Sequence, residues 1–487
     1  MKKKNKFEEA ILDKWQIFTP DTYVEKMLDI AGYRGEDILY KSILENSCGN
    51  GNILKKVVER FVGEAIKVGI KKDTISTLLA TNIVGFEIDH EVRKECLKNL
   101  NCITDNNSIP RVDWQIYEAD YLLFDLQKRF DFIIGNPPYI TYQELTNTQR
   151  ENLKKNFISC RKGKFDYCYP FIEKSLRDLN GKTGKLVYLI PSSIFKNVFG
   201  KSLRKLLIKD LTEVYDYGNI KVFENALVST SIINVNRSIK TNVLKYFKIS
   251  SDEEKEIIKE DLGDKWSFFD KEQLMDEETR KLGEYFKISN SVATLLNEVF
   301  VLTKFEDFDS KYIRTSEGSL IEKKILKKAA SPRSKAYDKK EMIIFPYYYK
   351  DKQLLSYTEQ EFMEKFPKTY EYLLVNKDKL LMRKSDKKAQ WFEYGRSQAL
   401  QYMHQPKLLL SSVITRKVNI YELDKETIPY SGFYIIPKGT LSLEFAKEVI
   451  ESPEFLKYLS NKGINASGHS LRFSVTDFLN YKISTET

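Results

Sequence analysis

An apolar strand runs directly into a double proline in the stretch FDFIIGNPPYI, residues 130–140. Each proline fixes its own φ and restricts the residue before it, so Asn136-Pro137-Pro138-Tyr139 is predicted to form a stiff loop at the carboxyl end of a buried strand. The loop would display one amide side chain, backbone carbonyls and one aromatic ring. A rigid strand-ending turn without further function is the simpler alternative.

Outward from this loop, short apolar runs alternate with amphipathic stretches. Strands are predicted at 42–46, 82–88, 114–119, 130–135, 184–191 and 228–236, and helices at 52–68, 90–100, 168–180 and 199–209. Strands that alternate with helices indicate an α/β fold with a doubly wound, mostly parallel sheet. Such sheets bind ligands at the carboxyl ends of their strands.

The composition is that of a globular protein, with 42% hydrophobic and 30% charged residues in a chain of 487. This length predicts two to four domains of roughly 100–200 residues each. The net charge of +10 permits a polyanionic partner without requiring one. Five cysteines without a C-x-x-C pair and three scattered histidines predict neither a disulfide framework nor a metal site. The sequence has no apolar signal core and no run of membrane-spanning length, so we expect a cytoplasmic protein.

The pattern changes after the polar stretch 250–265, which is interpreted as a linker or an exposed helix. Beyond it, basic clusters and aromatic residues are intermixed, beginning with the cluster at 323–335. We place a boundary near residue 245, which divides the chain into domains 1–245 and 246–487.

The loop at 136–139 suits chemistry on an amino group attached to a ring. The lone pair of the exocyclic amine of adenine is delocalised into the ring, which makes the amine a poor nucleophile. The amide oxygen of Asn136 and the carbonyl of Pro137 can both accept hydrogen bonds from that amine, and Tyr139 can stack on the ring. Together they would orient the lone pair toward a methyl donor by geometry and electrostatics, without a strong base.

A second turn joins a strand to a helix in SILENSCGNGNIL, residues 42–54. Glu45 ends the strand, and Gly49 and Gly51 allow the backbone to approach a ligand closely. Alone this signal is weak, because glycine-containing turns between strands and helices are common.

Two further carboxylates end the next predicted strands, Glu87 in IVGFEIDHEV and Asp120 in YEADYLLFD. An acidic residue at such a position can bind ribose hydroxyls in nucleotide-binding folds. Ile88 and Tyr121 follow them and could sandwich an adenine ring. Each carboxylate taken singly is as well explained by a solvated strand end, but three at consecutive strand ends favour a cofactor site.

In the order of these motifs the chain resembles the gamma class (Taq type) of DNA adenine-N6 methyltransferases of restriction–modification systems, over about residues 17–240. The matching motifs are, in chain order, Phe18-Thr19-Pro20, the loop from Glu45 to Gly51, Glu87, Asp120 and the loop at Asn136. The resemblance implies a Rossmann-like, class I methyltransferase fold with S-adenosylmethionine as cofactor. One departure is the GNG loop, which lacks the third glycine of the family's fuller form.

The resemblance also assigns roles to individual residues. The cofactor-binding residues that it implies are Thr19, Pro20, Glu45, Cys48, Gly49, Gly51, Glu87, Ile88, Asp120, Tyr121 and Asn136. Within this set Glu87 would hold the ribose and Asp120 the adenine amine. The catalytic residues that it implies are Asn136, Pro137, Tyr139 and Phe223.

Two later segments extend the resemblance. KFDYCYPFIEKSL (164–176) is similar to the family's next motif, with Phe171 near the pocket of the target base. VFENALVSTSIINV (222–235) is similar to the motif that provides a second aromatic residue, here Phe223. Because an adenine must leave the stack of the duplex to be methylated, Phe223 and Tyr139 would clamp the flipped-out base on both faces. A core aromatic is the alternative interpretation of Phe223.

The second half of the chain is interpreted as a mixed α+β domain that recognises the DNA target. Its candidate DNA-binding residues are Lys323, Lys324, Lys327, Lys328, Arg333, Lys335 and Arg396. Arg396 lies in WFEYGRSQAL (391–400), which resembles a segment in the recognition domains of related modification enzymes. Contacts to phosphate would supply affinity without sequence information, and a solvated charged face is the alternative.

Other functions stay open at this point. A protein glutamine N5-methyltransferase that acts on release factors carries the same Asn-Pro-Pro-Tyr loop, and an RNA methyltransferase could use it as well. A DNA-binding specificity subunit that has lost catalysis is a third alternative, which the intact loop disfavours. Double-stranded DNA is the expected partner, a separate restriction endonuclease is a further candidate, and the chain is expected to act as a monomer.

Overall fold

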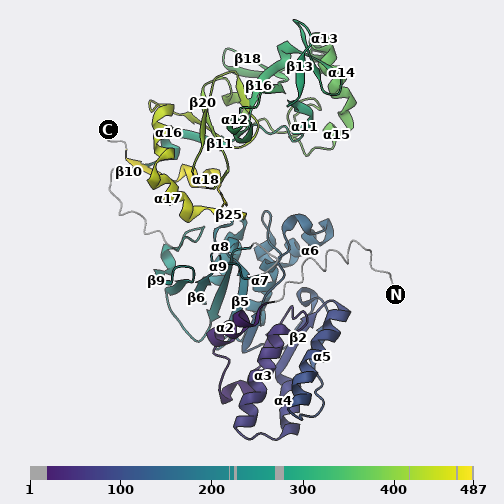
Figure 1. Cartoon of the computed structure of the whole chain (residues 1–487), viewed down its shortest axis with the longest axis vertical. Helices are drawn as coiled ribbons and strands as arrows, with labels where there is room; N and C mark the ends of the chain where they lie inside the picture. Colours follow the sequence, from purple (N-terminus) through teal and green to yellow (C-terminus); the bar gives the residue numbers. More distant parts are fainter. Residues whose placement is uncertain are drawn as a thin grey trace. The chain divides into compact units, whose positions relative to one another are not determined.

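The computed structural model describes residues 19–218, 220–223, 228–268, 279–415, 417–467 and 470–484. The chain divides into two compact units, Met1–Phe269 and Asp270–Thr487, which we call unit 1 and unit 2 (Figure 1). None of the helices among these described residues is long and apolar enough to cross a lipid bilayer.

Unit 1 is built on one large sheet with the strand order β3-β2-β1-β4-β5-β7-β6-β8-β9. The strands are β1 (Ile43–Glu45), β2 (Ile83–Glu87), β3 (Gln115–Glu118), β4 (Phe132–Gly135), β5 (Lys185–Pro191), β6 (Leu211–Asp216), β7 (Thr230–Asn236), β8 (Val243–Lys248) and β9 (Glu253–Ile258). The first five strands in this order are parallel, and β7 runs antiparallel to both of its neighbours. The predicted doubly wound, mostly parallel sheet is confirmed.

Helices cover both faces of this sheet. The helices of unit 1 are α2 (Asp21–Ala31), α3 (Asn52–Lys67), α4 (Lys72–Asn82), α5 (His90–Asn106), α6 (Asn147–Asn156), α7 (Cys168–Asp178), α8 (Ser193–Lys196) and α9 (Lys201–Leu207). Successive residues of a strand point to opposite faces, so Ile43 and Leu44 belong to different apolar cores. Helices α2 to α5 complete the core that contains Ile43, and α6, α7 and α9 complete the core that contains Leu44.

The six predicted strands are all present, with ends that differ from the structure by a few residues at most. The polar stretch 250–265, interpreted as a linker or an exposed helix, instead contains the strand β9, which pairs with β8 at the edge of the sheet. An edge strand that is largely solvated needs few apolar residues, so its sequence carries little strand signal. The predicted boundary near residue 245 falls inside β8, and unit 1 continues past it to Phe269.

Unit 2 is a mixed α+β fold of several small sheets, as predicted. Its strands are β10 (Thr279–Lys281), β11 (Phe286–Asn290), β12 (Val301–Leu302), β13 (Phe305–Asp307), β14 (Tyr312–Thr315), β15 (Leu320–Glu322), β16 (Leu326–Ala330), β17 (Glu341–Ile344), β18 (Tyr347–Lys350), β19 (Gln353–Ser356), β20 (Lys407–Leu410), β21 (Val413–Ile414), β22 (Ile420–Leu423), β23 (Thr427–Pro429), β24 (Phe433–Pro437), β25 (Ile464–Ser467), β26 (Ser470–Arg472) and β27 (Lys482–Ser484). Its two larger sheets have the orders β11-β24-β20-β22 and β12-β17-β16-β23.

The helices of unit 2 are α10 (Leu282–Tyr285), α11 (Asn297–Phe300), α12 (Pro332–Ala336), α13 (Glu359–Lys365), α14 (Pro367–Val375), α15 (Lys377–Leu381), α16 (Leu443–Glu451), α17 (Pro453–Lys462) and α18 (Val475–Leu479). All of them except α12 contribute side chains to one of two separate apolar cores. Helices α11, α13, α14 and α15 share one core with β17, and α16, α17 and α18 share the other with β11 and β20.

Candidate active site

The carboxyl ends of β1, β2, β3 and β4 meet at one edge of the sheet in unit 1. Strand β1 lies between β2 and β4, so the chain winds away from it in both directions, and this switch point is where doubly wound sheets bind ligands. Glu45 ends β1, Glu87 ends β2, Asp120 follows β3 and Asn136 follows β4. The fold thus brings four of the sequence-predicted residues to the same edge.

The loop after β1 is held from two sides. The Cys48 N–H donates to the carbonyl of Phe86 at 2.8 Å, and the Gly49 N–H donates to Glu87 Oε2 at 3.0 Å. Gly51 has a φ of 88°, and a Cβ on it would lie 2.7 Å from the Cys96 sulfur. This position therefore requires glycine both for its backbone conformation and for its close approach to α5.

Glu45 is a buried carboxylate beneath this loop. Its Oε2 has no hydrogen-bond partner within the part of the chain that the structure describes. Burial raises the pKa of Glu45 well above its usual value, and the Cys96 thiol and the Glu87 carboxylate add to this shift, while the backbone N–H of Leu54 opposes it. A buried carboxylate with an open oxygen is suited to a positively charged ligand.

Glu87 and Asp120 are partly buried at the neighbouring strand ends. Glu87 Oε1 accepts from the Asp89 N–H at 2.8 Å, and Asp120 Oδ1 accepts from the Leu122 N–H at 2.9 Å. Burial is the main cause that raises the pKa of both carboxyls. Ile88 is 61% exposed beside Glu87, which leaves an apolar surface at this edge.

Tyr121, the other predicted neighbour of an adenine ring, lies deeper. It is buried, its hydroxyl donates to Asp178 Oδ2 at 2.8 Å, and its ring packs 5.8 Å from Phe171. Phe171 is itself buried and also contacts Tyr167, with the ring centroids 5.5 Å apart. Both side chains therefore belong to the buried core that contains Leu44 and are not exposed at the edge of the sheet.

The loop after β4 is tied to the loop after β1. The Ser47 hydroxyl donates to the backbone carbonyl of Asn136 at 3.3 Å. Tyr139 and Phe223 meet edge to face, with ring centroids 6.0 Å apart and an angle of 72° between the planes. Phe223 is also a member of the core that contains Ile43. The structure thus brings the two predicted rings into direct contact at the border of this core.

The N-terminal motif reaches the same region. Thr19 is buried, and its carbonyl accepts from Asn52 Nδ2 at 3.4 Å, at the start of α3. Pro20 precedes the first residue of α2. Phe18, the first residue of the predicted motif, lies outside the described residues.

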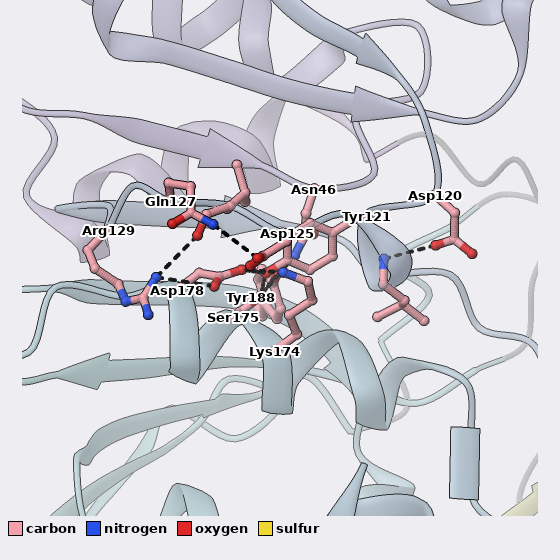
Figure 2. Close-up of polar contacts among 12 residues, drawn as sticks. Asn46, Asp120, Tyr121, Asp125, Gln127, Arg129, Lys174, Ser175, Asp178 and Tyr188 are labelled. Atoms are coloured by element: carbon pink, nitrogen blue, oxygen red, sulfur yellow. Dashed lines mark hydrogen bonds and ion pairs between the residues drawn. The ribbon is translucent and has the colours of Figure 1, made fainter. Parts of the chain in front are cut away.

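A buried polar network beneath the two loops escaped the sequence analysis (Figure 2). Asn46 Nδ2 donates to the Tyr188 hydroxyl at 2.6 Å and to Ser175 Oγ at 2.8 Å, and Ser175 and Tyr188 lie 2.7 Å apart. The network continues through Tyr121 to Asp178, which also accepts from Lys174 Nζ at 2.8 Å. Asn46, Tyr121 and Ser175 each lie in a motif that the sequence singled out, but no local pattern links these three motifs to one another or to Tyr188 and Asp178.

The predicted DNA-binding residues of unit 2 divide into two groups. Lys323 pairs with Asp307, Lys327 with Glu426, Lys328 with Asp424, and Arg396 with Asp386. For Lys324, Arg333 and Lys335, no ion pair is present within the described ranges. Four of the seven candidates are therefore already compensated by acidic side chains.

Comparison with known proteins agrees with this arrangement. Residues 64–223 match the family described as the Eco57I restriction-modification methylase. The type II methyltransferase M.BstVI of Geobacillus stearothermophilus is 27% identical over 232 residues, which are 45% of this chain and 41% of that protein. The type II restriction enzyme and methyltransferase RM.Eco57I of Escherichia coli is 26% identical over 408 residues, which are 69% of this chain and 40% of that protein. The chain thus spans about two fifths of the length of these curated relatives.

Among solved structures, the type IIL restriction-modification enzyme MmeI, determined in complex with DNA, matches with a TM-score of 0.58 and 13% identity. The match covers 94% of this chain and 65% of that one, and at this identity it concerns the fold. The sheet and its edge define unit 1 as a class I methyltransferase fold. Residues 64–223 are thus similar to the Eco57I restriction-modification methylase family, and the predicted resemblance to restriction–modification methyltransferases is confirmed. Fold and family imply S-adenosylmethionine as the cofactor.

Proposed function

We propose that the chain is a DNA methyltransferase that transfers a methyl group from S-adenosylmethionine to the exocyclic N6 amine of adenine. One observation carries the proposal, namely that the loop Asn136–Tyr139 leaves β4 at the switch point of the sheet, beside the loop after β1. The family match and the DNA-modifying relatives support DNA as the class of substrate.

The residues at the edge of the sheet fit the cofactor. S-adenosylmethionine, when bound, supplies an electrophilic methyl group on a positively charged sulfur. Glu45 offers a buried oxygen without a partner among the described residues, which suits a cationic ligand. Glu87 and Asp120, partly buried at the neighbouring strand ends, offer acceptors for ribose hydroxyls and for an adenine amine.

The acceptor loop would position the target amine. The amide oxygen of Asn136 and the carbonyl of Pro137 would each accept one of its N–H groups, which favours a pyramidal nitrogen with its lone pair free to attack. Ser47 fixes the adjacent carbonyl of Asn136, so the loop is braced before substrate arrives. The contribution is orientation and electrostatic stabilisation, and no side chain has to abstract a proton before attack.

Tyr139 and Phe223 would hold the extruded base. A base stacked between two rings requires them to lie parallel at about 7 Å, twice the usual contact distance between carbon atoms. The two rings stand at 72° and 6.0 Å, so they have to turn and part slightly when a base enters. Their mutual contact would fill the pocket in the absence of a base.

The test is transfer of labelled methyl groups to duplex DNA, to transfer RNA and to a release factor in parallel. We expect label in duplex DNA only, recovered as N6-methyladenine after digestion and mass spectrometry. Asn136→Ala should lower kcat by about 10²–10³, the usual cost of removing one preorganised hydrogen-bonding group. Asn106→Ala, an exposed amide at the end of α5, should leave kcat unchanged.

Two results would contradict the proposal. Label in transfer RNA or in the release factor without label in DNA would reassign the substrate to one of the alternative classes. Unchanged transfer to DNA in Asn136→Ala would remove the loop from the reaction.

A further inference from the structure

Exposed apolar side chains gather where α14 ends and α15 follows in unit 2. Val375 is 86% exposed, Met382 78% and Leu381 60%. Between them Leu380 is buried in the core shared by α11, α13, α14 and α15. The short helix α15 is thus anchored by Leu380, while Leu381, the preceding Val375 of α14 and the following Met382 are exposed to solvent, where they gain nothing for folding.

Lysines without acidic partners follow immediately along the chain. Lys384, Lys387 and Lys388 are exposed, and none of them forms an ion pair within the ranges that the structure covers. They contrast with Lys323, Lys327 and Lys328, each of which faces a carboxylate. Removing water and counter-ions from an uncompensated lysine to bind a phosphate breaks no existing ion pair, which makes Lys384, Lys387 and Lys388 the better phosphate ligands.

The segment is held firmly enough to present these side chains. The Arg383 guanidinium donates to the carbonyls of Thr294 at 2.6 Å, Trp391 at 2.7 Å and Leu380 at 2.9 Å. One arginine therefore ties the end of α15 to two other parts of unit 2. Figure 1 shows α11, α14 and α15 together in the same region of this unit.

A strained leucine lies beside this anchor. Leu295 follows Thr294, is 43% exposed and has a φ of 59°, a conformation that is unfavourable for a bulky side chain. Its side chain rests on Gly395, where a Cβ would lie 2.4 Å from Leu295 Cδ1. Gly395 lies in the segment 391–400, which the sequence singled out, and its lack of a side chain makes room for Leu295. Strain that the surrounding structure maintains is typical of functional surfaces.

We propose that Val375, Leu381, Met382, Lys384, Lys387 and Lys388, the α15 surface, contact duplex DNA. The inference rests on the proposed function and names the part of unit 2 that binds the substrate. The lysines would bind phosphates, and the apolar side chains would enter the minor groove, as apolar wedges of DNA-bending proteins do. A polyanion is the occupant that this charge favours, because the lysines follow the apolar side chains directly along the chain and form no ion pair among the described residues.

The experiment compares two triple variants of the full chain. Lys384→Gln/Lys387→Gln/Lys388→Gln and Lys323→Gln/Lys327→Gln/Lys328→Gln each remove three positive charges, so they change the net charge equally. The affinity for one duplex is measured at several salt concentrations between 50 and 200 mM. Three lost phosphate contacts should reduce the slope of log affinity against log salt by about 2.7 in the first variant. The second variant should keep a slope within about one unit of the wild-type value.

When salt is raised from 50 to 200 mM, both proteins should lose affinity for the duplex. The fold-loss of the wild type should be about 40 times larger than the fold-loss of the first variant. A third variant, Leu381→Ser/Met382→Ser, should weaken duplex binding about tenfold or more without changing the slope. Because its two side chains are exposed, it should fold as the wild type does, and thermal unfolding of the full chain followed by circular dichroism provides the check.

The outcomes separate this inference from the proposed function. A wild type that neither binds nor methylates duplex DNA overturns the proposed function and the inference with it. If the wild type methylates DNA but the Lys384/Lys387/Lys388 variant keeps the wild-type slope of log affinity against log salt, the inference alone is overturned. The α15 surface would then be assigned to a protein partner.

Discussion

Two buried tyrosines of unit 1 show how much a hydroxyl depends on its neighbours. Tyr188 accepts from Asn46 and lies 2.7 Å from Ser175, whereas the Tyr33 hydroxyl has no partner within the described part of the chain. Both rings are fully buried. A hydroxyl that completes a network stabilises the fold, and one buried without a partner costs the energy of its lost hydration.

We therefore predict opposite effects of the same chemical change. Tyr188→Phe should lower the free energy of unfolding by about 1–3 kcal/mol, because the buried Asn46 amide loses an acceptor. Tyr33→Phe should be neutral or stabilising. Urea denaturation of both variants measures the difference, and an equal loss of stability in the two would show that the network contributes nothing.

At the scale of elements, the turn from β1 into α3 decides where the cofactor loop lies. The positive φ of Gly51 and its contact with Cys96 let the chain turn sharply between the strand and the helix. Within α3, which Gly51 precedes as the N-cap residue, Gly63 has no atom within 4 Å of the place where a Cβ would be. The backbone conformation and the close contact thus require glycine at position 51, whereas the surroundings of Gly63 leave room for a side chain.

Substitution of each glycine by alanine should therefore change the stability of the protein in opposite directions. Gly51→Ala should cost about 1–3 kcal/mol of unfolding free energy through strain and contact with the Cys96 sulfur, and should weaken cofactor binding. Gly63→Ala should stabilise the protein by about 0.5–1 kcal/mol, because alanine is the better helix former. Chemical denaturation and calorimetric titration with S-adenosylmethionine give both quantities, and a harmless Gly51→Ala would refute the steric account.

At the scale of the whole molecule, the limit of unit 1 is set by strand pairing. Strand β8 pairs with β6 and β9, and its Tyr246 is buried against Phe268, with the ring centroids 4.4 Å apart. The Trp266 ring packs on Phe195, and the backbone N–H of Trp266 donates to the Phe195 carbonyl at 2.8 Å. Residues beyond 245 therefore complete the core of unit 1.

Two fragments test this limit. The fragment 1–269 should unfold cooperatively, whereas 1–245 loses half of β8, all of β9 and the three buried aromatic side chains of Tyr246, Trp266 and Phe268. At roughly 1.5–3 kcal/mol for each large apolar side chain, the shorter fragment should melt at least about 10 °C lower. Thermal unfolding followed by circular dichroism measures this, and equal melting temperatures would place the limit at 245.

Local signals in the sequence determined the parallel sheet and its order of motifs. Prolines 137 and 138, glycines 49 and 51, and the alternation of apolar runs act within a few residues of one another, so their effects can be predicted without the fold. The same locality explains why the strand ends with Glu45, Glu87, Asp120 and Asn136 could be placed in advance.

The tertiary structure alone decided which polar groups meet. Asn46 and Tyr188 are 142 positions apart, and Lys328 and Asp424 are 96 apart, so no local pattern could pair them. The run of basic residues at 323–335 predicts a phosphate-binding segment. In the folded chain, three of its lysines form ion pairs with carboxylates that are distant in sequence. Hydrogen bonds and ion pairs depend on distance in space, whereas strands, helices and turns depend largely on neighbours in the chain.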